Sequence, residues 1–335
     1  MREHVSDRSG GDLLHTQDSE TYRRLVQEEA RYWDEHPESL LSARPLPAIQ
    51  RYLNERATGR ADVEWHETIS DYGAFERGCV LGAGPGHVEE HLLGRHPGLH
   101  LSVFDISGEA LARVGARLQA SFPGRLETCQ KDLNFVTLRP DSYDLVVANS
   151  CIHHLLNLEH VAFQVNRALT TDGYFFMQDT VGESYFQFSE EKKRLFKAFV
   201  LATQGKLARS GIPWPAREAW PFSPFESVRS AEILDVFGRY LREERLRTSS
   251  ALLQLLLFAS PNAPRLLGTG LAKQRARVFS AVRRTLVRSK PSLDRRLATG
   301  ELLFALDSVF CDTGYLRPGL AFAVYRKRGE GEDHT

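Results

Sequence analysis

The sequence has little of what marks a secreted, membrane-spanning or metal-binding chain. Its 335 residues include four cysteines, which are scattered without the spacing of metal ligands: Cys79, Cys129, Cys151 and Cys311. We therefore expect no metal, and free thiols in a reducing compartment. No apolar run is long enough to cross a bilayer, and residues 1–12 lack the apolar core of a signal peptide. The expected location is the cytoplasm.

The chain also lacks a net charge. Lys and Arg together number 43, equal to Asp and Glu, so no global field attracts nucleic acid or a membrane. The one basic region is 265–296, and within it residues 271–288 are expected to form an ordinary amphipathic helix. A site for an acidic acceptor, a phosphate or RNA is the alternative for this region.

A glycine-rich turn is the most informative feature that is present. Residues 79–90, CVLGAGPGHVEE, indicate a buried strand, a tight turn and the start of a helix, whose free N–H groups can face a ligand. A dinucleotide site would need glycine at position 87, where this chain has His87. The next predicted strand, 99–105, ends in Asp105, a carboxylate placed to accept both hydroxyls of a ribose. For the turn alone, an ordinary strand–turn–helix corner remains the alternative.

Three further strands are predicted at 126–130, 142–149 and 173–179, separated by helical patterns. Strands that alternate with helices form crossover units and a parallel sheet. Ligands of such sheets lie beyond the carboxyl ends of the strands. The loops after these strands are therefore the expected site.

The turn, with glycines at 82, 84 and 86, resembles motif I of the class I S-adenosylmethionine-dependent methyltransferases. Segments 152–159, 180–188 and 224–233 are similar to one bacterial subfamily of methyltransferase-domain proteins, and the similarity runs from about residue 33 to residue 325. The resemblance implies an α/β fold: a Rossmann-like, seven-stranded, mostly parallel sheet with helices on both faces, N-terminal helices and a helical lid insertion. It places a sixth strand within 243–257 and a seventh at 320–325, as antiparallel neighbours.

The resulting domain prediction has four parts. Residues 1–18 and 329–335 are expected to be disordered, and 19–74 to form a helical cap with helices at 20–36 and 46–57. The methyltransferase domain spans 75–328. Within it lie an aromatic, proline-rich lid insertion at 182–225 and a helical insertion at 262–312. A purely structural cap is the alternative for the lid.

The resemblance also implies S-adenosylmethionine as the cofactor. In this family an acidic residue after the second strand binds the ribose, and one after the third accepts a hydrogen bond from the adenine amino group. One departure is Val80, at a position that is often acidic; a backbone carbonyl could serve in its place. The predicted cofactor-binding residues are Gly82, Ala83, Gly84, Gly86, Asp105, Ile106, Asp132, Leu133 and Asn149.

Two adjacent histidines are the candidates for acid–base chemistry. His153 and His154 follow the fourth strand, and histidine is the usual general base near neutral pH. We favour His154, because equivalent positions in related methyltransferases face the acceptor. Asp179, at the end of the fifth strand, is expected to orient that histidine or bind the acceptor. The alternative is that one histidine starts the following helix and packs there.

The predicted function is methyl transfer to a hydroxyl or amine of a small molecule, with specialised metabolism as a setting by analogy. Residues 149–152, NSCI, lack the Asn/Asp-Pro-Pro-Tyr/Phe motif of enzymes that methylate nucleobase or glutamine amino groups. Two alternatives stay open: a methyltransferase acting on RNA or protein, and a cofactor-binding protein without methyl transfer. The expected partner is a small-molecule acceptor, with no nucleic acid and no membrane. The sequence leaves the acceptor and the oligomeric state open.

Overall fold

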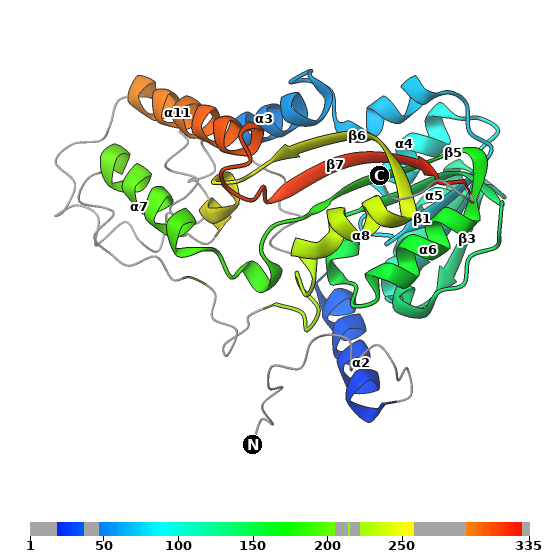
Figure 1. Cartoon of the computed structure of the whole chain (residues 1–335). Helices are drawn as coiled ribbons and strands as arrows, with labels where there is room; N and C mark the ends of the chain where they lie inside the picture. Colours follow the sequence, from blue (N-terminus) through cyan, green and yellow to red (C-terminus); the bar gives the residue numbers. More distant parts are fainter. Residues whose placement is uncertain (1–18, 37–46, 205–213, 215–221, 258–292, 330–335) are drawn as a thin grey trace, which may run out of the picture.

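The computed structural model describes residues 19–36, 47–204, 214, 222–257 and 293–329 (Figure 1). Its strands are β1 (Arg77–Leu81), β2 (His100–Asp105), β3 (Leu126–Gln130), β4 (Tyr143–Asn149), β5 (Leu169–Thr180), β6 (Leu241–Ser249) and β7 (Leu320–Lys327). Its α-helices are α2 (Glu20–Glu35), α3 (Pro47–Thr58), α4 (His87–Arg95), α5 (Gly108–Ser121), α6 (Leu158–Ala168), α7 (Glu190–Gln204), α8 (Ile233–Tyr240) and α11 (Leu293–Asp312).

The seven strands form one sheet in the order β3-β2-β1-β4-β5-β7-β6. Strands β1 to β5 pair in parallel, and β7 lies antiparallel between β5 and β6. The predicted Rossmann-like fold is therefore confirmed, including the antiparallel pair at one side. Some boundaries differ. β5 begins at Leu169 rather than at residue 173. β6 begins at Leu241, before the predicted window 243–257, and ends at Ser249, followed by a 3-10 turn at Leu253–Leu257, and β7 extends to Lys327 rather than ending at residue 325.

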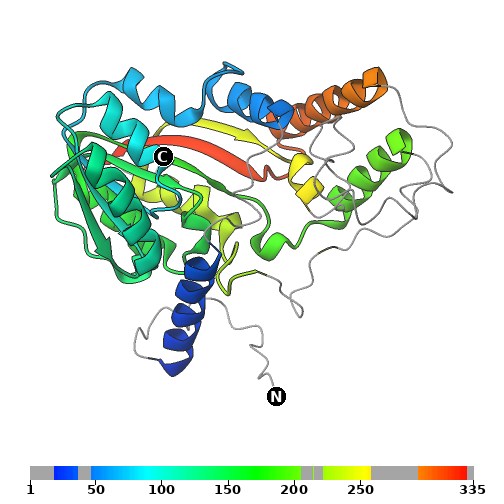
Figure 2. The same ribbon diagram turned by 180° about the vertical axis from the view of Figure 1, so that it is seen from behind.

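Alternate residues of the strands feed two hydrophobic cores, one on each face of the sheet. Val146, Phe175 and Met177 point toward α6 and α8, whereas Val147 and Phe176 point toward α4 and α5. This alternation follows from the two-residue period of a strand, and burial on both faces explains the continuous apolar runs in the sequence. Figures 1 and 2 show the two helical layers from opposite sides.

A third cluster lies away from the main sheet faces. Helices α3 and α11 run side by side (Figures 1 and 2), and they pack with α7 and the turn Leu253–Leu257. Four phenylalanines of the predicted lid insertion belong to this cluster: Phe186, Phe188, Phe196 and Phe199. This part of the insertion therefore buries apolar surface, as the alternative of a structural cap requires.

Several predictions fall outside the described residues. These are the expected disorder of 1–18 and of nearly all of 329–335, most of the proline-rich part of 182–225, and the helix at 271–288 with most of the basic region 265–296. The predicted helices at 20–36 and 46–57 correspond to α2 and α3, each within one residue at both ends. All four cysteines carry free thiols. In the described part of the chain, none of the helices has the length and apolar character needed to span a membrane.

Candidate functional site

The glycine-rich turn between β1 and α4 has a backbone that other residues would strain. Gly82, Gly84 and Gly86 have φ values of +84°, +46° and +76°. A Cβ atom on Gly82 would lie 2.7 Å from Cys151 Cβ, so only glycine lets the loops after β1 and β4 approach this closely. Above Gly84, in contrast, a Cβ would meet no atom within 4 Å. The turn therefore borders open space at the carboxyl edge of the sheet.

Asp105, at the end of β2, is held by the turn. Its carboxylate accepts hydrogen bonds from the N–H groups of Ala83 and Ser107, each at 2.7 Å. Burial raises the pKa of this carboxyl, and the hydrogen bonds from Ser107 and Ala83 oppose the rise. Each carboxylate oxygen has a second lone pair, so the side chain can still accept from the hydroxyls of a ligand.

Asp132, after β3, already has two donors. Its Oδ2 accepts from the hydroxyl of Tyr22 at 2.6 Å, and its Oδ1 accepts from the N–H of Asn134 at 2.9 Å. The next residue, Leu133, is buried and begins a 3-10 turn, Leu133–Phe135. The carboxylate is thus fixed at the edge where the sequence places the adenine.

The remaining predicted cofactor residues lie at the same edge. The carbonyl of Ile106, directly after Asp105, accepts from Gln130 Nε2 at 3.0 Å. Asn149, which is half-buried, ends β4 and pairs with Gln178 of β5. The fold therefore brings the loops after β1, β2, β3 and β4 together, as expected for parallel strands.

Helix α2 closes over these loops from the outside (Figure 2). Its Tyr22 binds Asp132 after β3, and its Asp34 accepts from Ser107 Oγ after β2 at 2.6 Å. Between them, Glu29 lies 3.2 Å from His154 Nδ1, after β4. The helix thus contacts the loops after β2, β3 and β4.

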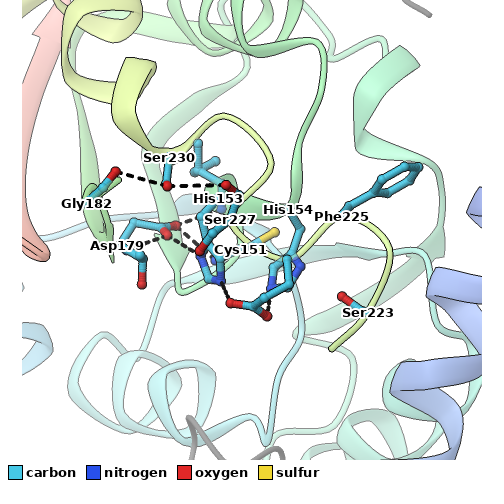
Figure 3. A network of polar contacts seen from close by, with 12 residues as sticks. Cys151, His153, His154, Asp179, Gly182, Ser223, Phe225, Ser227 and Ser230 are labelled. Atoms are coloured by element: carbon cyan, nitrogen blue, oxygen red, sulfur yellow. Dashed lines mark hydrogen bonds and ion pairs between the residues drawn. The ribbon is translucent and has the colours of Figure 1, made fainter. Parts of the chain in front are cut away.

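His153 is buried between two carboxylates. It lies in the 3-10 turn Ile152–His154, with 3% of its side chain exposed. Its Nδ1 is 2.5 Å from Asp179 Oδ1, and its Nε2 is 3.4 Å from Glu226 Oε1. Burial lowers the pKa of His153, but Asp179 and Glu226 outweigh it and raise the pKa to about 10. Figure 3 shows Asp179 on one side of the His153 ring.

His154 lies beside His153, with ring centroids 4.1 Å apart, and it is the more exposed of the two at 11% (Figure 3). Its Nε2 is 3.6 Å from Glu226 Oε2, and the indole of Trp33 meets its ring edge-on. The structure differs from the sequence prediction in one respect. Asp179 contacts His153 and the N–H groups of Cys151 and Ile152, whereas Glu29 and Glu226 face His154.

Sequence reasoning missed Glu226 and Glu29 as members of this site. Both side chains are almost fully buried, and burial raises the pKa of each carboxyl. The neighbouring histidines, together with hydrogen-bond donors, outweigh burial, so both pKa values lie below the ordinary value. Glu29 also accepts from Ser223 Oγ, Phe225 N–H and Trp33 Nε1. The available signal for Glu29 was a carboxylate on the apolar face of a predicted helix. For Glu226 it was an acidic residue inside a segment with a family resemblance.

Comparison with known proteins gives one family match. Residues 80–175 match a family model described as a methyltransferase domain. No curated protein sequence matches the chain.

Three of the solved structures that match this chain are methyltransferases. Phosphoethanolamine N-methyltransferase 2 of Haemonchus contortus is 16% identical, with 97% of this chain and 61% of that chain covered and a TM-score of 0.44. The N-methyltransferase NodS of Bradyrhizobium japonicum WM9 is 13% identical, with 93% and 100% covered and a TM-score of 0.43. Geranyl diphosphate C-methyltransferase of Streptomyces coelicolor A3(2) is 10% identical, with 91% and 98% covered and a TM-score of 0.46.

Proposed function

We propose that the chain is a class I, S-adenosylmethionine-dependent methyltransferase that transfers a methyl group to a hydroxyl or amine of a small molecule, since residues 80–175 match a methyltransferase domain. One observation carries this proposal. The glycine turn, Asp105, Asp132 and the histidine pair all lie at the carboxyl edge of one parallel sheet. A nucleoside-bearing cofactor and an acceptor bound along this edge would meet beside β4.

The residues present fit S-adenosylmethionine. Open space above Gly84 leaves room for the amino-acid part of the cofactor. Asp105 is oriented by two N–H groups and retains lone pairs for the ribose hydroxyls. Asp132 and Leu133 would hold the adenine, and Ile106 and Asn149 would complete the walls of the cofactor site. The bound cofactor supplies a methyl group on a positively charged sulfur.

The protein's contribution to the reaction is mainly positioning, which can supply much of the rate of a displacement. His154 is the proposed general base for a hydroxyl acceptor, because its ring is more exposed than that of His153. Glu29 and Glu226 orient His154, and Asp179 positions His153. Segment 222–228 and α2 exclude water from these side chains, through buried Phe225, Val228 and Tyr22.

The test has two parts. Calorimetry should show binding of S-adenosylmethionine with no comparable affinity for NAD, and preferential binding of NAD would contradict the cofactor assignment. A panel of small hydroxyl and amine compounds should then give S-adenosylhomocysteine as a product. With the best acceptor from that panel, His154→Ala should slow turnover by about 10²–10⁴-fold while cofactor affinity stays nearly unchanged. An equal loss of cofactor affinity would show a structural role instead.

A further inference from the structure

Three side chains, two of them buried and His154 partly buried, converge beside the end of β4. His153 and His154 each direct Nε2 toward the carboxylate of Glu226, at 3.4 Å to Oε1 and 3.6 Å to Oε2. Both distances exceed the usual range for a hydrogen bond between nitrogen and oxygen. Glu226 is 2% exposed, and its Oε1 has no hydrogen-bond partner. A buried carboxylate oxygen without a donor is costly unless a ligand completes its environment.

A second carboxylate lies near the Nδ1 atom of each imidazole. Asp179 Oδ1 lies 2.5 Å from Nδ1 of His153, and Glu29 Oε1 lies 3.2 Å from Nδ1 of His154. Each ring is therefore placed between an outer carboxylate at Nδ1 and the central Glu226 at Nε2. For His153, which has a hydrogen-bond contact with Asp179, this is the arrangement that holds histidine ligands of metals, in which a carboxylate at one ring nitrogen fixes the orientation of the other. At His154 the contact with Glu29 is an ion pair without hydrogen-bond geometry.

The outer carboxylates are themselves held in place. Asp179 accepts from the N–H groups of Cys151 and Ile152, at 2.9 and 2.7 Å. Glu29 accepts from Trp33 Nε1 at 2.7 Å and from Phe225 N–H at 3.0 Å. The side chains that orient the two histidines thus come from β5 and α2, and neither is free to swing away.

We propose that His153, His154 and Glu226 bind one divalent transition-metal ion, which takes the place of the proton on Nε2 of His153 and releases that proton to solvent. One ligand atom from each residue lies within 4.8 Å of the others. The nearest oxygen of Glu226 lies 3.4 Å from Nε2 of His153 (Oε1) and 3.6 Å from Nε2 of His154 (Oε2). Ligands about 2.0–2.1 Å from a tetrahedral zinc ion lie about 3.4 Å from one another, so small movements close the set. Two imidazoles and a carboxylate suit Zn²⁺, Fe²⁺ or Co²⁺ and leave coordination positions open.

We expected no metal because the cysteines lack the spacing of metal ligands, but the proposed ligands are two histidines and a glutamate. Glu226 comes from a segment far along the chain from the histidines, so no local motif predicts it. If the proposed function holds, the open positions would accept an oxygen of the acceptor, which favours a hydroxyl acceptor over an amine. In that case His154 acts as a ligand rather than as the base. This last consequence rests on the proposed function, whereas metal binding does not.

The test uses the full-length protein, freed of metal with a chelator and studied without cofactor. Titration with Zn²⁺ by calorimetry should show one equivalent bound. Titration with Co²⁺ should give visible absorption bands of a low-coordinate site with nitrogen and oxygen ligands. The spectrum also separates this site from adventitious binding to the free cysteines, which would add thiolate charge-transfer bands.

Variants assign the site. Glu226→Gln and His154→Ala should weaken Zn²⁺ binding by more than about 100-fold, and the outer-carboxylate variant Asp179→Asn by about 10–100-fold. His100→Ala, an exposed histidine on β2, is the matched control and should bind as the wild type does. Circular dichroism checks the fold of each variant.

Two results would overturn the proposal. One is the absence of a stoichiometric site in the wild-type protein; the other is unchanged binding in both Glu226→Gln and His154→Ala. If a variant does not fold, the wild-type Co²⁺ spectrum decides, and an aquo-ion or thiolate spectrum rejects the site. S-adenosylmethionine affinity of the same metal-free protein is measured separately, so failure of the metal site and failure of the proposed function are distinguishable.

Discussion

At the scale of the residue, Asp105 links two loops and faces the proposed ribose site at the same time. Its two carboxylate oxygens bind the N–H groups of Ala83 and Ser107. A neutral amide at this position would keep the shape of the side chain but would offer one acceptor oxygen in place of two. The substitution therefore keeps the size of the side chain but sets an NH2 group against the N–H of Ala83 or Ser107, so thermal unfolding is measured beside affinity.

We expect Asp105→Asn to weaken S-adenosylmethionine binding by roughly tenfold to a few hundredfold. Hydrogen bonds to a charged group contribute about 1.5–3 kcal/mol each, and 1.4 kcal/mol corresponds to about tenfold in affinity. Calorimetry measures the change. Asp235→Asn, on the exposed side of α8, is the control and should leave affinity unaltered. Wild-type affinity in a folded Asp105→Asn protein would remove the ribose role.

Two glycines of the same turn should respond differently to alanine. Gly82→Ala brings a methyl group within 2.7 Å of Cys151 Cβ at a φ of +84°, so we expect a marked loss of stability. Gly84→Ala has open space around its methyl group and a φ of +46°, so strain alone should cost about 1–2 kcal/mol. Its methyl group would instead occupy the proposed cofactor space. Thermal unfolding and calorimetry on both variants test this contrast, which equal stability losses would contradict.

At the scale of the element, α2 is joined to the domain by a small cluster and a few polar contacts. Tyr22 packs with Phe225, Leu156 and Val228, and its ring stacks on Phe225 at 6.2 Å. Glu29, also on α2, accepts a hydrogen bond from the N–H of Phe225 in the same segment. Docking of this helix and order in segment 222–228 therefore depend on each other.

Phe225→Ala should loosen α2 without unfolding the sheet. Removal of a buried phenylalanine side chain costs about 3–5 kcal/mol, and here that cost falls on a local contact between one helix and one loop. We expect amide hydrogen exchange in residues 20–35 to rise at least tenfold, by rough estimate, with β1 to β5 unchanged. Phe163→Ala, on α6, removes a ring that is 49% exposed and serves as the control. Unchanged exchange in α2 would mean that other contacts hold the helix.

At the scale of the whole molecule, one buried carboxyl links stability to pH. Glu89, in the first turn of α4, is 2% exposed, and its Oε1 has no partner. Burial raises the pKa of this side chain to about 8. In the unfolded chain the group ionises near its ordinary pKa of about 4.3, so the unfolded state releases its proton first as the pH rises. As the pH rises from the lower of these two pKa values to the higher, the contribution of Glu89 to the free energy of unfolding therefore decreases.

We expect Glu89→Gln to flatten the pH dependence of the free energy of unfolding between about pH 5 and pH 8. Urea unfolding at three pH values in this range measures it. Glu90→Gln, its exposed neighbour, should keep the wild-type slope. Identical slopes in all three proteins would show that Glu89 is ionised in the folded state.

The sequence predicted the sheet well because its signals are local. The strand that contains Val146 and Val147 is a short apolar run between turn signals. The glycines between β1 and α4 indicate by themselves a turn with positive φ values. The candidate site was predicted only in part. Three side chains come to the site from segments distant in sequence: Tyr22, Glu29 and Glu226. The periodicity of a helix does not predict which loop that helix will contact. The proposed roles of the site residues remain predictions.

The placement of β7 has a consequence for how the chain is made. This strand lies between β5 and β6, so β6 has no sheet partner until residues 320–327 are present. During synthesis the ribosome must therefore release most of the chain before the edge of β5 is covered. Until then, one edge of β5, a twelve-residue strand with a buried, apolar centre, has no partner strand. The nascent chain is consequently most prone to aggregate in the interval between completion of β5 and emergence of β7.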